Sequence, residues 1–240
     1  VYRQALAVEP DNEMAQGLLV QNLAEEERFD EIVDLCKTSL QYTPDNQQLC
    51  YFEGFSLFQL KRNDEALASL QKTVELRDEE SDSGMMSDCY SLIGEIYREK
   101  GMNKACYEAY DSCLHYAPDN VGALNNYAYY LSLDSAADLQ KAEQMSLKAV
   151  QKEPDNATFL DTYAWILFKE KRYDDAKTIA ERAIASDSTL SSVVVEHCGD
   201  IFYMAGDTDR AMEMWQKAVL EDEDNAILRR KIELKKYIEE

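Results

Sequence analysis

The residues that could carry covalent or metal chemistry are few, and their spacing argues against such chemistry. The chain has two histidines, His115 and His197, and His197 is followed directly by Cys198. A cysteine nucleophile needs a general base within hydrogen-bond reach, but neighbouring residues on a helix point about 100° apart. Cys113 and His115 fail for a similar reason, and no third or fourth ligand lies at the spacing of a zinc site. We therefore expect no catalytic residue and no metal site.

Carboxylate pairs and phosphate loops are not supported either. The chain has 47 Asp and Glu residues, yet abundance on an acidic surface gives no particular pair of carboxyl groups a raised pKa. The stretches "GMNKA" and "GDTDRA" lack the spacing of a phosphate-binding loop and fit turns between helices. The sequence therefore predicts neither an enzyme nor a cofactor.

The charge of the chain limits its partners. It has 25 basic and 47 acidic residues, a formal net charge of -22, so we expect it to bind neither nucleic acid nor anionic lipid. No apolar run approaches the roughly 20 residues that span a bilayer, so we expect no direct membrane insertion. The stretch "VYRQALAVEP" begins inside a helical pattern, which indicates a fragment whose leader would lie upstream of Val1.

The cysteines show no CxxC pair and fall mostly in apolar helical positions, which indicates free, buried thiols and leans toward a reducing compartment. The compartment nevertheless stays open between the cytoplasm and the cell envelope. The six cysteines are Cys36, Cys50, Cys89, Cys106, Cys113 and Cys198.

The triplet "PDN" contains every proline of the chain, at Pro10, Pro44, Pro118 and Pro154. The intervals are 34, 74 and 36 residues, and the middle one equals two periods of 34 plus six. A fixed period in this range indicates stacked supersecondary units. Proline ends one helix and the Asp-Asn that follows offers side-chain acceptors to cap the next. The triplet is thus predicted to be the junction between units.

Aligned on this period, each unit shows two amphipathic helices. One column holds mainly small residues, as needed where two helix backbones approach closely. Gly101 and Gly206 mark the turn between the helices of their units. Each unit is therefore predicted to be a helical hairpin. The small-residue column consists of Val20, Gly54, Gly94, Ala128, Ala164 and Gly199.

These columns resemble the tetratricopeptide repeat, a helix–turn–helix family with a 34-residue period, and the C-terminal run looks most like bacterial members. The resemblance implies an all-α fold, a right-handed α-α superhelix (solenoid) of hairpins that forms one domain over residues 1–240. The insertion at 81–86 should form a loop or an extra turn of helix, and the one in "LSLDSAADLQ" should lengthen the fourth hairpin or its turn. The expected parts are a partial repeat (1–12), six repeats (13–46, 47–80, 87–120, 121–156, 157–190 and 192–225) and a capping helix (226–240).

In this family the first helices of the repeats line the concave face, and a helical wheel places large rings there, away from the core stripe. Such rings indicate a recognition surface, although they could instead pack against the next repeat with no ligand. The carboxylate clamp by which some members hold chaperone tails needs cations, which this face lacks. The predicted groove residues are Tyr51, Phe55, Phe58, Asn125, Asn126, Tyr129, Asp161, Trp165, Phe168, Glu196, Asp200 and Tyr203.

The sequence therefore predicts a scaffold that binds a peptide segment or partner protein, apolar or basic, in this groove. The alternative is a structural assembly or oligomerisation module with no groove ligand, and the oligomeric state stays open. RNA binding, as in the similar pentatricopeptide repeat, would need a basic inner face, whereas this one is acidic.

Overall fold

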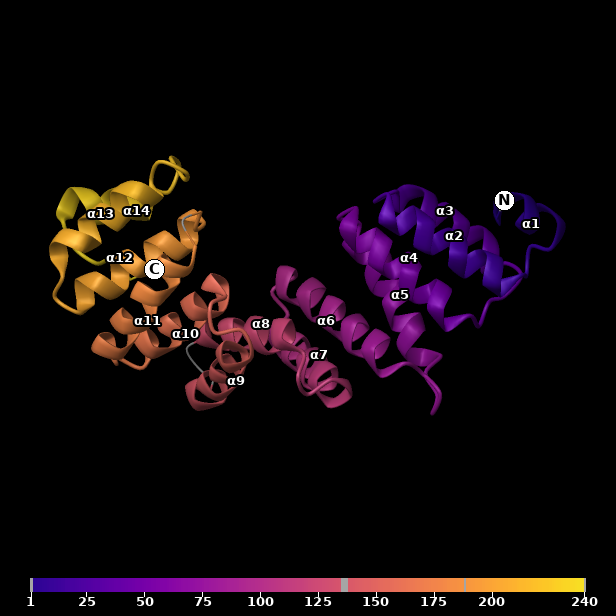
Figure 1. The fold of residues 1–240 in the computed structure, drawn as a ribbon, viewed down its shortest axis with the longest axis horizontal. Coiled ribbons are helices and arrows are strands. Elements are labelled where there is room, and N and C mark those ends of the chain that lie inside the picture. The colour runs from indigo at the N-terminus through magenta and orange to yellow at the C-terminus, as the bar shows by residue number, and fades with distance from the viewer. Residues whose placement is uncertain (1, 135–137, 188, 240) are drawn as a thin grey trace. The chain divides into compact units, whose positions relative to one another are not determined.

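The structure, a computed structural model, describes residues 2–134, 138–187 and 189–239. Within these ranges all regular secondary structure is helical (Figure 1). Helix α1 (Tyr2–Val8) comes first and α14 (Ala226–Leu234) last. Between them, six hairpins follow one another: α2 (Glu13–Glu25) with α3 (Phe29–Ser39), α4 (Gln47–Gln59) with α5 (Asn63–Glu75), α6 (Ser83–Glu99) with α7 (Asn103–Tyr116), α8 (Val121–Ser132) with α9 (Leu139–Lys152), α10 (Ala157–Lys169) with α11 (Tyr173–Ser186), and α12 (Ser192–Met204) with α13 (Thr208–Ala218).

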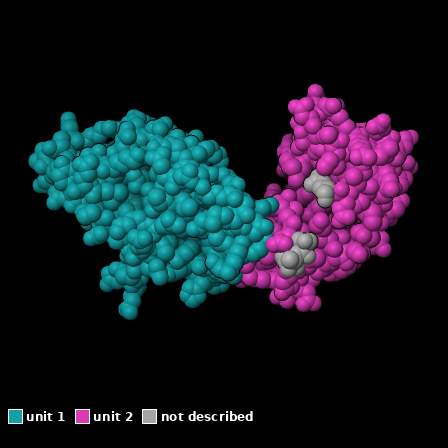
Figure 2. Space-filling model, turned by 180° about the vertical axis from the view of Figure 1, so that it is seen from behind, with its two compact units in different colours: residues 1–120 teal, residues 121–240 magenta. Residues whose placement is uncertain are grey.

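The hairpins form two compact units, which Figure 2 colours separately. Unit 1 is Val1–Asn120 and contains α1 to α7, and unit 2 is Val121–Glu240 and contains α8 to α14. Each unit has buried apolar clusters of its own, in which the second helix of a hairpin packs on the first. A single domain over the whole chain remains a prediction.

The junction between hairpins behaves as the "PDN" triplet predicts, with the asparagine as the capping residue. The side chains of Asn12 and Asn46 accept hydrogen bonds from the backbone amides of Ala15 and Leu49, at 2.9 and 3.0 Å. Asn156 caps α10 in the same way. Each asparagine thus satisfies an amide that the first turn of a helix leaves without a partner.

The close approach of paired helices explains the small-residue column. A Cβ atom added to Gly54 would lie 2.7 Å from Leu70 Cγ, and one added to Gly199 would lie 2.4 Å from Trp215 Cδ1. Both distances are shorter than real contacts allow, because the second helix places a large side chain directly against the glycine. The predicted reason for glycine at these positions is confirmed.

A left-handed residue occupies the turn of five hairpins. At Gly101 the amide bonds to the carbonyl of Arg98 at 3.0 Å, and the amide of Met102 bonds to that of Tyr97 at 2.9 Å. Gly101 and Gly206 confirm the predicted turns. In three other hairpins a residue with a side chain adopts the same left-handed conformation. The left-handed turn residues are Glu27, Lys61, Gly101, Lys171 and Gly206, with φ from 55° to 85°.

The insertion at 81–86 is mostly helical, which confirms one of the two expected forms. Helix α6 begins at Ser83 and has 17 residues, whereas α4 has 13. The side chain of Asp82 caps it by accepting from the amide of Met85 at 2.7 Å, and Met86 is fully buried. The insertion therefore adds a turn to α6. The second predicted insertion, around 135–137, lies outside the described residues.

Helix α14 lies after the last hairpin, where the sequence predicts a capping helix over 226–240, but it ends at Leu234 because Lys235 takes a left-handed conformation, so residues 235–239 are not helical. Leu228 is fully buried, and the helix packs against α13. Asn225 caps it, and after Leu234 the chain turns so that residues 237–239 lie beside residues of α10 and α12. In the described part of the chain, no helix combines the length and apolar character needed to cross a membrane.

Candidate functional site

Nine of the twelve predicted recognition residues lie in unit 2, on the first helices α8, α10 and α12, whose shared face is called here the first-helix face. Helix α10 contacts both α8 and α12. Trp165 and Phe168 lie three residues apart on α10, so their rings share one side of the helix. The rings stack with centroids 4.9 Å apart and an interplanar angle of 12°. Trp165 is 8% exposed and Phe168 5%, so the pair is a buried wall rather than two free rings.

His197 of α12 extends this wall. Its imidazole stacks on the Trp165 indole with centroids 4.0 Å apart and an angle of 17°. Its Nδ1 lies 3.0 Å from Asp161 Oδ2. Burial lowers the pKa of His197, but the charge and hydrogen bond of Asp161, with Asp200 and Glu196 nearby, outweigh burial and hold the pKa above its usual value. The wall therefore carries a cation whenever His197 is protonated.

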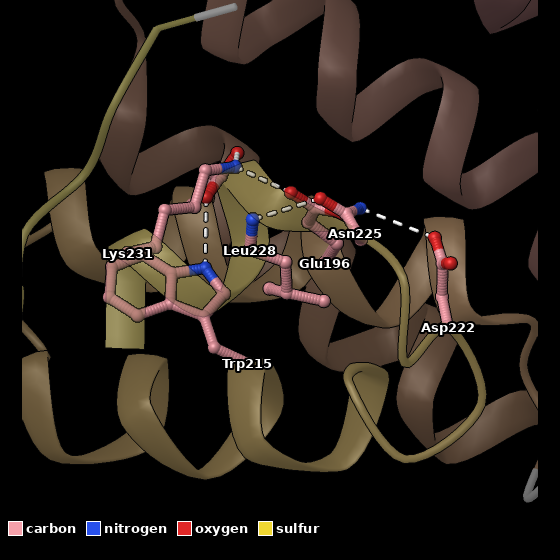
Figure 3. A network of polar contacts seen from close by, with 7 residues as sticks. Glu196, Trp215, Asp222, Asn225, Leu228 and Lys231 are labelled. Atoms are coloured by element: carbon pink, nitrogen blue, oxygen red, sulfur yellow. Dashed lines mark hydrogen bonds and ion pairs between the residues drawn. The ribbon is translucent and has the colours of Figure 1, made fainter. Parts of the chain in front are cut away.

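A buried lysine holds the two acidic residues of α12. Lys231 comes from α14, is 1% exposed, and donates to Glu196 Oε1 and to Asp200 Oδ2, both at 2.7 Å (Figure 3). The indole of Trp215 donates to Asp200 Oδ1 at 2.9 Å, and Asn225 donates to Glu196 Oε2 at 3.1 Å. Burial raises the pKa of Asp200 to about 6 although Lys231 opposes the shift. The network ties α12, α13 and α14 together.

A pocket of about 370 Å³ opens where the aromatic wall meets this network. Tyr129 and Trp165 supply rings, and Glu196 and Asp200 supply carboxylates. Its rim includes two exposed apolar residues, Leu133 (43%) and Val193 (51%). The pocket thus combines apolar surface and aromatic rings, which recognise an apolar or aromatic side chain, with carboxylates of which Glu196 and Asp200 are already paired with Lys231. The remaining lining residues are Lys169, His197, Asp222, Asn225, Tyr237, Ile238 and Glu239.

The structure sorts the predicted residues of unit 2 into three groups. Tyr129, Trp165, Glu196 and Asp200 line the pocket. Asp161 and Phe168 adjoin it through the contacts of their side chains with His197 and Trp165. The others lie apart from the lining: Asn125, whose amide donates to Asn126 at 3.3 Å, Asn126 itself, and Tyr203, whose ring is 5.6 Å from that of Trp215.

The predicted residues of unit 1 form a different arrangement. Tyr51, Phe55 and Phe58 of α4 are half-buried. The Tyr51 and Phe55 centroids are 6.3 Å apart, and Phe29 of α3 lies 6.1 Å from Phe55. These rings pack against each other and against the neighbouring hairpin, the alternative that the sequence left open. Their role in binding remains a prediction.

Sequence reasoning missed most of the other residues of the site, among them His197, Lys231 and Tyr237. The sequence suggests His197 only as a partner of Cys198, whereas its contacts are with Asp161 and Trp165. Lys231 and Tyr237 lie outside the repeats, where the period gives no register. One signal could have revealed Lys231, because it lies three residues after Leu228 in the apolar stripe of the final helix.

Cys198 of α12 lies in the buried core. The Cys198 thiol is 1% exposed, and burial raises its pKa well above the usual range. Cys113, the other cysteine near a histidine in sequence, is also buried, and the six cysteines of the chain are unpaired. Among the residues that the structure describes, no group of three or more His, Cys, Asp or Glu side chains could hold a metal ion.

Comparison with protein families points to one repeat type. The family model described as "Tetratricopeptide repeat" matches residues 87–120. A curated protein of Caenorhabditis elegans, stress-induced-phosphoprotein 1, is 25% identical over 107 residues. That alignment covers 42% of this chain and 33% of the relative, so this chain matches about a third of the relative's length.

Solved structures share the fold over nearly the whole chain. A tetratricopeptide repeat protein from Parabacteroides merdae superposes with a TM-score of 0.61 at 14% identity, covering 98% of this chain and 89% of that one. YrrB, described as a tetratricopeptide repeat protein with an unusual peptide-binding site, does so with a TM-score of 0.57 at 11% identity, covering 97% and 98%. The predicted fold class, an all-α solenoid of helical hairpins, is confirmed.

Proposed function

Since the chain belongs to the tetratricopeptide-repeat family, we propose that it binds a peptide segment of a partner protein on the first-helix face of unit 2. Proteins built from this repeat are generally interaction scaffolds without catalytic activity. The observation that carries the finer proposal is the pocket at Trp165, where four of the predicted residues meet.

The lining of the pocket supports a basic or aromatic partner segment. The ring of Tyr129 lines the pocket and attracts a cation through its π face, and the carboxylate of Asp222 in the lining favours the same charge. Trp165 already stacks on Phe168 and His197 and contributes apolar surface instead. Leu133 and Val193 on the rim offer apolar surface that would be covered in a complex. An acidic peptide is disfavoured because the chain as a whole carries a net charge of -22.

One structural neighbour adds support. YrrB is described as having an unusual peptide-binding site, which agrees with a peptide ligand on a fold of this kind. An assembly module with no groove ligand, the alternative from the sequence, is not favoured. The identity of the partner is left to experiment.

The test is a selection of linear peptides, displayed as a random library, against the full chain. We expect enrichment of peptides that place Lys or Arg beside an aromatic residue. Selected peptides should lose binding to the Val193→Lys and Leu133→Lys variants, because each puts a positive charge on the rim and removes an apolar contact.

The matched control is Leu147→Lys on α9. Leu147 is also an exposed apolar residue (36%), but it lies outside the pocket. Peptides should bind this variant as they bind the wild type. Enrichment without any basic or aromatic preference, or equal binding to the rim variants and the control, contradicts the proposal.

A further inference from the structure

Three residues that follow α14, at positions 237–239, line the pocket of the proposed binding face. Helix α14 ends at Leu234, and Lys235 takes a left-handed conformation with φ 51° and ψ 42°. The amide of Lys236 closes the turn by bonding to the carbonyl of Lys231 at 3.1 Å. The residues that follow the helix, 235–239, are called here the tail. The turn directs the tail back over the first-helix face instead of continuing away from it.

The tail supplies one wall of the pocket. Tyr237 and Ile238 are half-buried and line it together with Trp165. The Tyr237 ring meets Phe168 edge-on with centroids 5.6 Å apart, and Lys231 Nζ lies 5.6 Å from the centre of the same ring. Tyr237 therefore continues the aromatic row that Trp165 and Phe168 begin.

The tail is held weakly compared with the helix before it. Beyond the turn its backbone has no regular secondary structure, and Lys235 and Lys236 are exposed. Two half-buried side chains anchor it, and the conformational freedom lost on ordering its five residues offsets much of what their burial contributes. By contrast, α14 is held by buried Leu228 and by the ion pairs of Lys231. The tail can therefore leave the face while α14 stays in place.

The chemistry of the tail matches that of the surface beneath it. Its sequence, "KKYIE", places two lysines directly before an aromatic and an aliphatic residue. The surface offers rings and carboxylates to such a segment. The tail therefore has the properties proposed above for an external ligand.

We propose that the tail is an internal ligand of the first-helix face. The partner segment then carries a basic pair followed by an aromatic and an aliphatic residue, and these last two side chains take the places of Tyr237 and Ile238. The inference rests on the proposed function for the partner. Because the tail occupies the face in the free protein, the affinity measured for a partner is reduced by the fraction of molecules whose face is covered.

The test uses a fluorescent peptide with the sequence of residues 234–239, "LKKYIE", as the probe. It is titrated into the full chain and into the double variant Tyr237→Ala/Ile238→Ala, which removes the two side chains that anchor the tail and leaves the residues of α14 unchanged. We expect the double variant to bind the probe about tenfold more tightly than the wild type. A probe with alanine in place of its Tyr and Ile should bind neither protein. Circular dichroism checks that the double variant is folded.

A second measurement needs no added ligand. Acrylamide should quench the fluorescence of Trp165 more strongly in the double variant, since the tail no longer covers its wall; Trp215 is fully buried and contributes equally in both proteins. Equal quenching together with equal probe binding overturns the inference. If quenching and probe binding are equal in the two proteins but library peptides still lose binding in the Val193→Lys variant, the inference about the tail fails and the proposed function stands. If quenching and probe binding rise but no library peptide is enriched, only the proposed function fails.

Discussion

The two units use the same hairpin but present different first-helix faces. In unit 1 the rings of Tyr51 and Phe55 pack on each other, Phe55 also packs on Phe29 of the neighbouring hairpin, and Phe58 packs against the core cluster. In unit 2 the rings of Trp165 and Phe168 meet acidic residues, a histidine and a lysine, with a pocket between them. The repeat supplies the scaffold in both units. In unit 2, α14 and the tail add Lys231 and one wall of the pocket.

This difference shows how a repeat protein can gain a site at its end. The closing helix must bury its apolar side against the last hairpin. Here that helix also brings Lys231 to Glu196 and Asp200, two acids that would otherwise be buried without a cation. The same device that closes the stack therefore organises the acidic part of the pocket. Four variants test or refine this contrast.

The largest effect is expected from Lys231→Met. It leaves Glu196 and Asp200 with no cation in a buried place, so unit 2 should lose about 3–5 kcal/mol of unfolding free energy. The control is Lys37→Met in unit 1, where Lys37 Nζ lies 3.6 Å from a Glu65 carboxylate oxygen at the surface. Loss of this exposed ion pair should hardly change the urea concentration at which unit 1 unfolds. Urea denaturation measures both, and equal losses in the two variants refute the proposed role of Lys231.

Gly199→Ala should be next in size. The new Cβ would lie 2.4 Å from Trp215, which Asp200 also holds, so the helix pair must separate at a cost of about 1–3 kcal/mol. A Cβ atom added to Gly17 in α2 would meet no neighbouring group within 4 Å, and Gly17→Ala should be neutral or stabilise by up to about 1 kcal/mol. Chemical denaturation of the two variants should give opposite or clearly unequal shifts. A neutral Gly199→Ala would show that close approach is not required in unit 2.

The turns should respond alike in both units, because they share one geometry. Lys171→Gly removes a side chain from a left-handed residue with φ 64° and should stabilise unit 2 by about 1 kcal/mol. Lys61→Gly should gain less, since Lys61 Nζ also lies 5.4 Å from the centre of the Phe58 ring. Thermal unfolding compares them. Loss of stability in both variants would show that the turn conformation carries no strain.

The smallest effect is the pH dependence that His197 adds to the stability of unit 2. The pKa of His197 is raised in the folded state by Asp161, Asp200 and Glu196, so its contribution is complete below the unfolded value of about 6.5 and is lost as pH rises through the folded pKa. The stability advantage of the wild type over His197→Gln should therefore be larger at pH 5.5 than at pH 9. The control, His115→Gln, probes the other histidine. An advantage that grows with pH contradicts the assigned direction.

Much of the fold follows from the sequence because the period repeats the same constraints in each unit. Small residues at Gly54 and Gly199, asparagine at Asn46 and Asn156, and the helical insertion before α6 are local requirements that a pattern can reveal. The division into two compact units, by contrast, has no visible sequence signal.

The site follows from the sequence only in part. The helical wheel found Trp165 and Asp200 because a face of a helix is a local property. It could not find Lys231 or Tyr237, since their positions depend on where the chain turns after Leu234 and not on the repeat. It also overestimated the exposure of Trp165, which the neighbouring His197 and Phe168 cover.

The most direct test of peptide binding at unit 2 follows the two tryptophan indoles of the chain by NMR. A selected basic and aromatic peptide is titrated into the ¹⁵N-labelled protein, and the indole N–H signals of Trp165 and Trp215 are recorded. Binding in the pocket should shift the Trp165 signal most, since that indole lines the pocket while Trp215 is buried behind Asp200. A saturable titration that leaves the Trp165 signal in place contradicts the account.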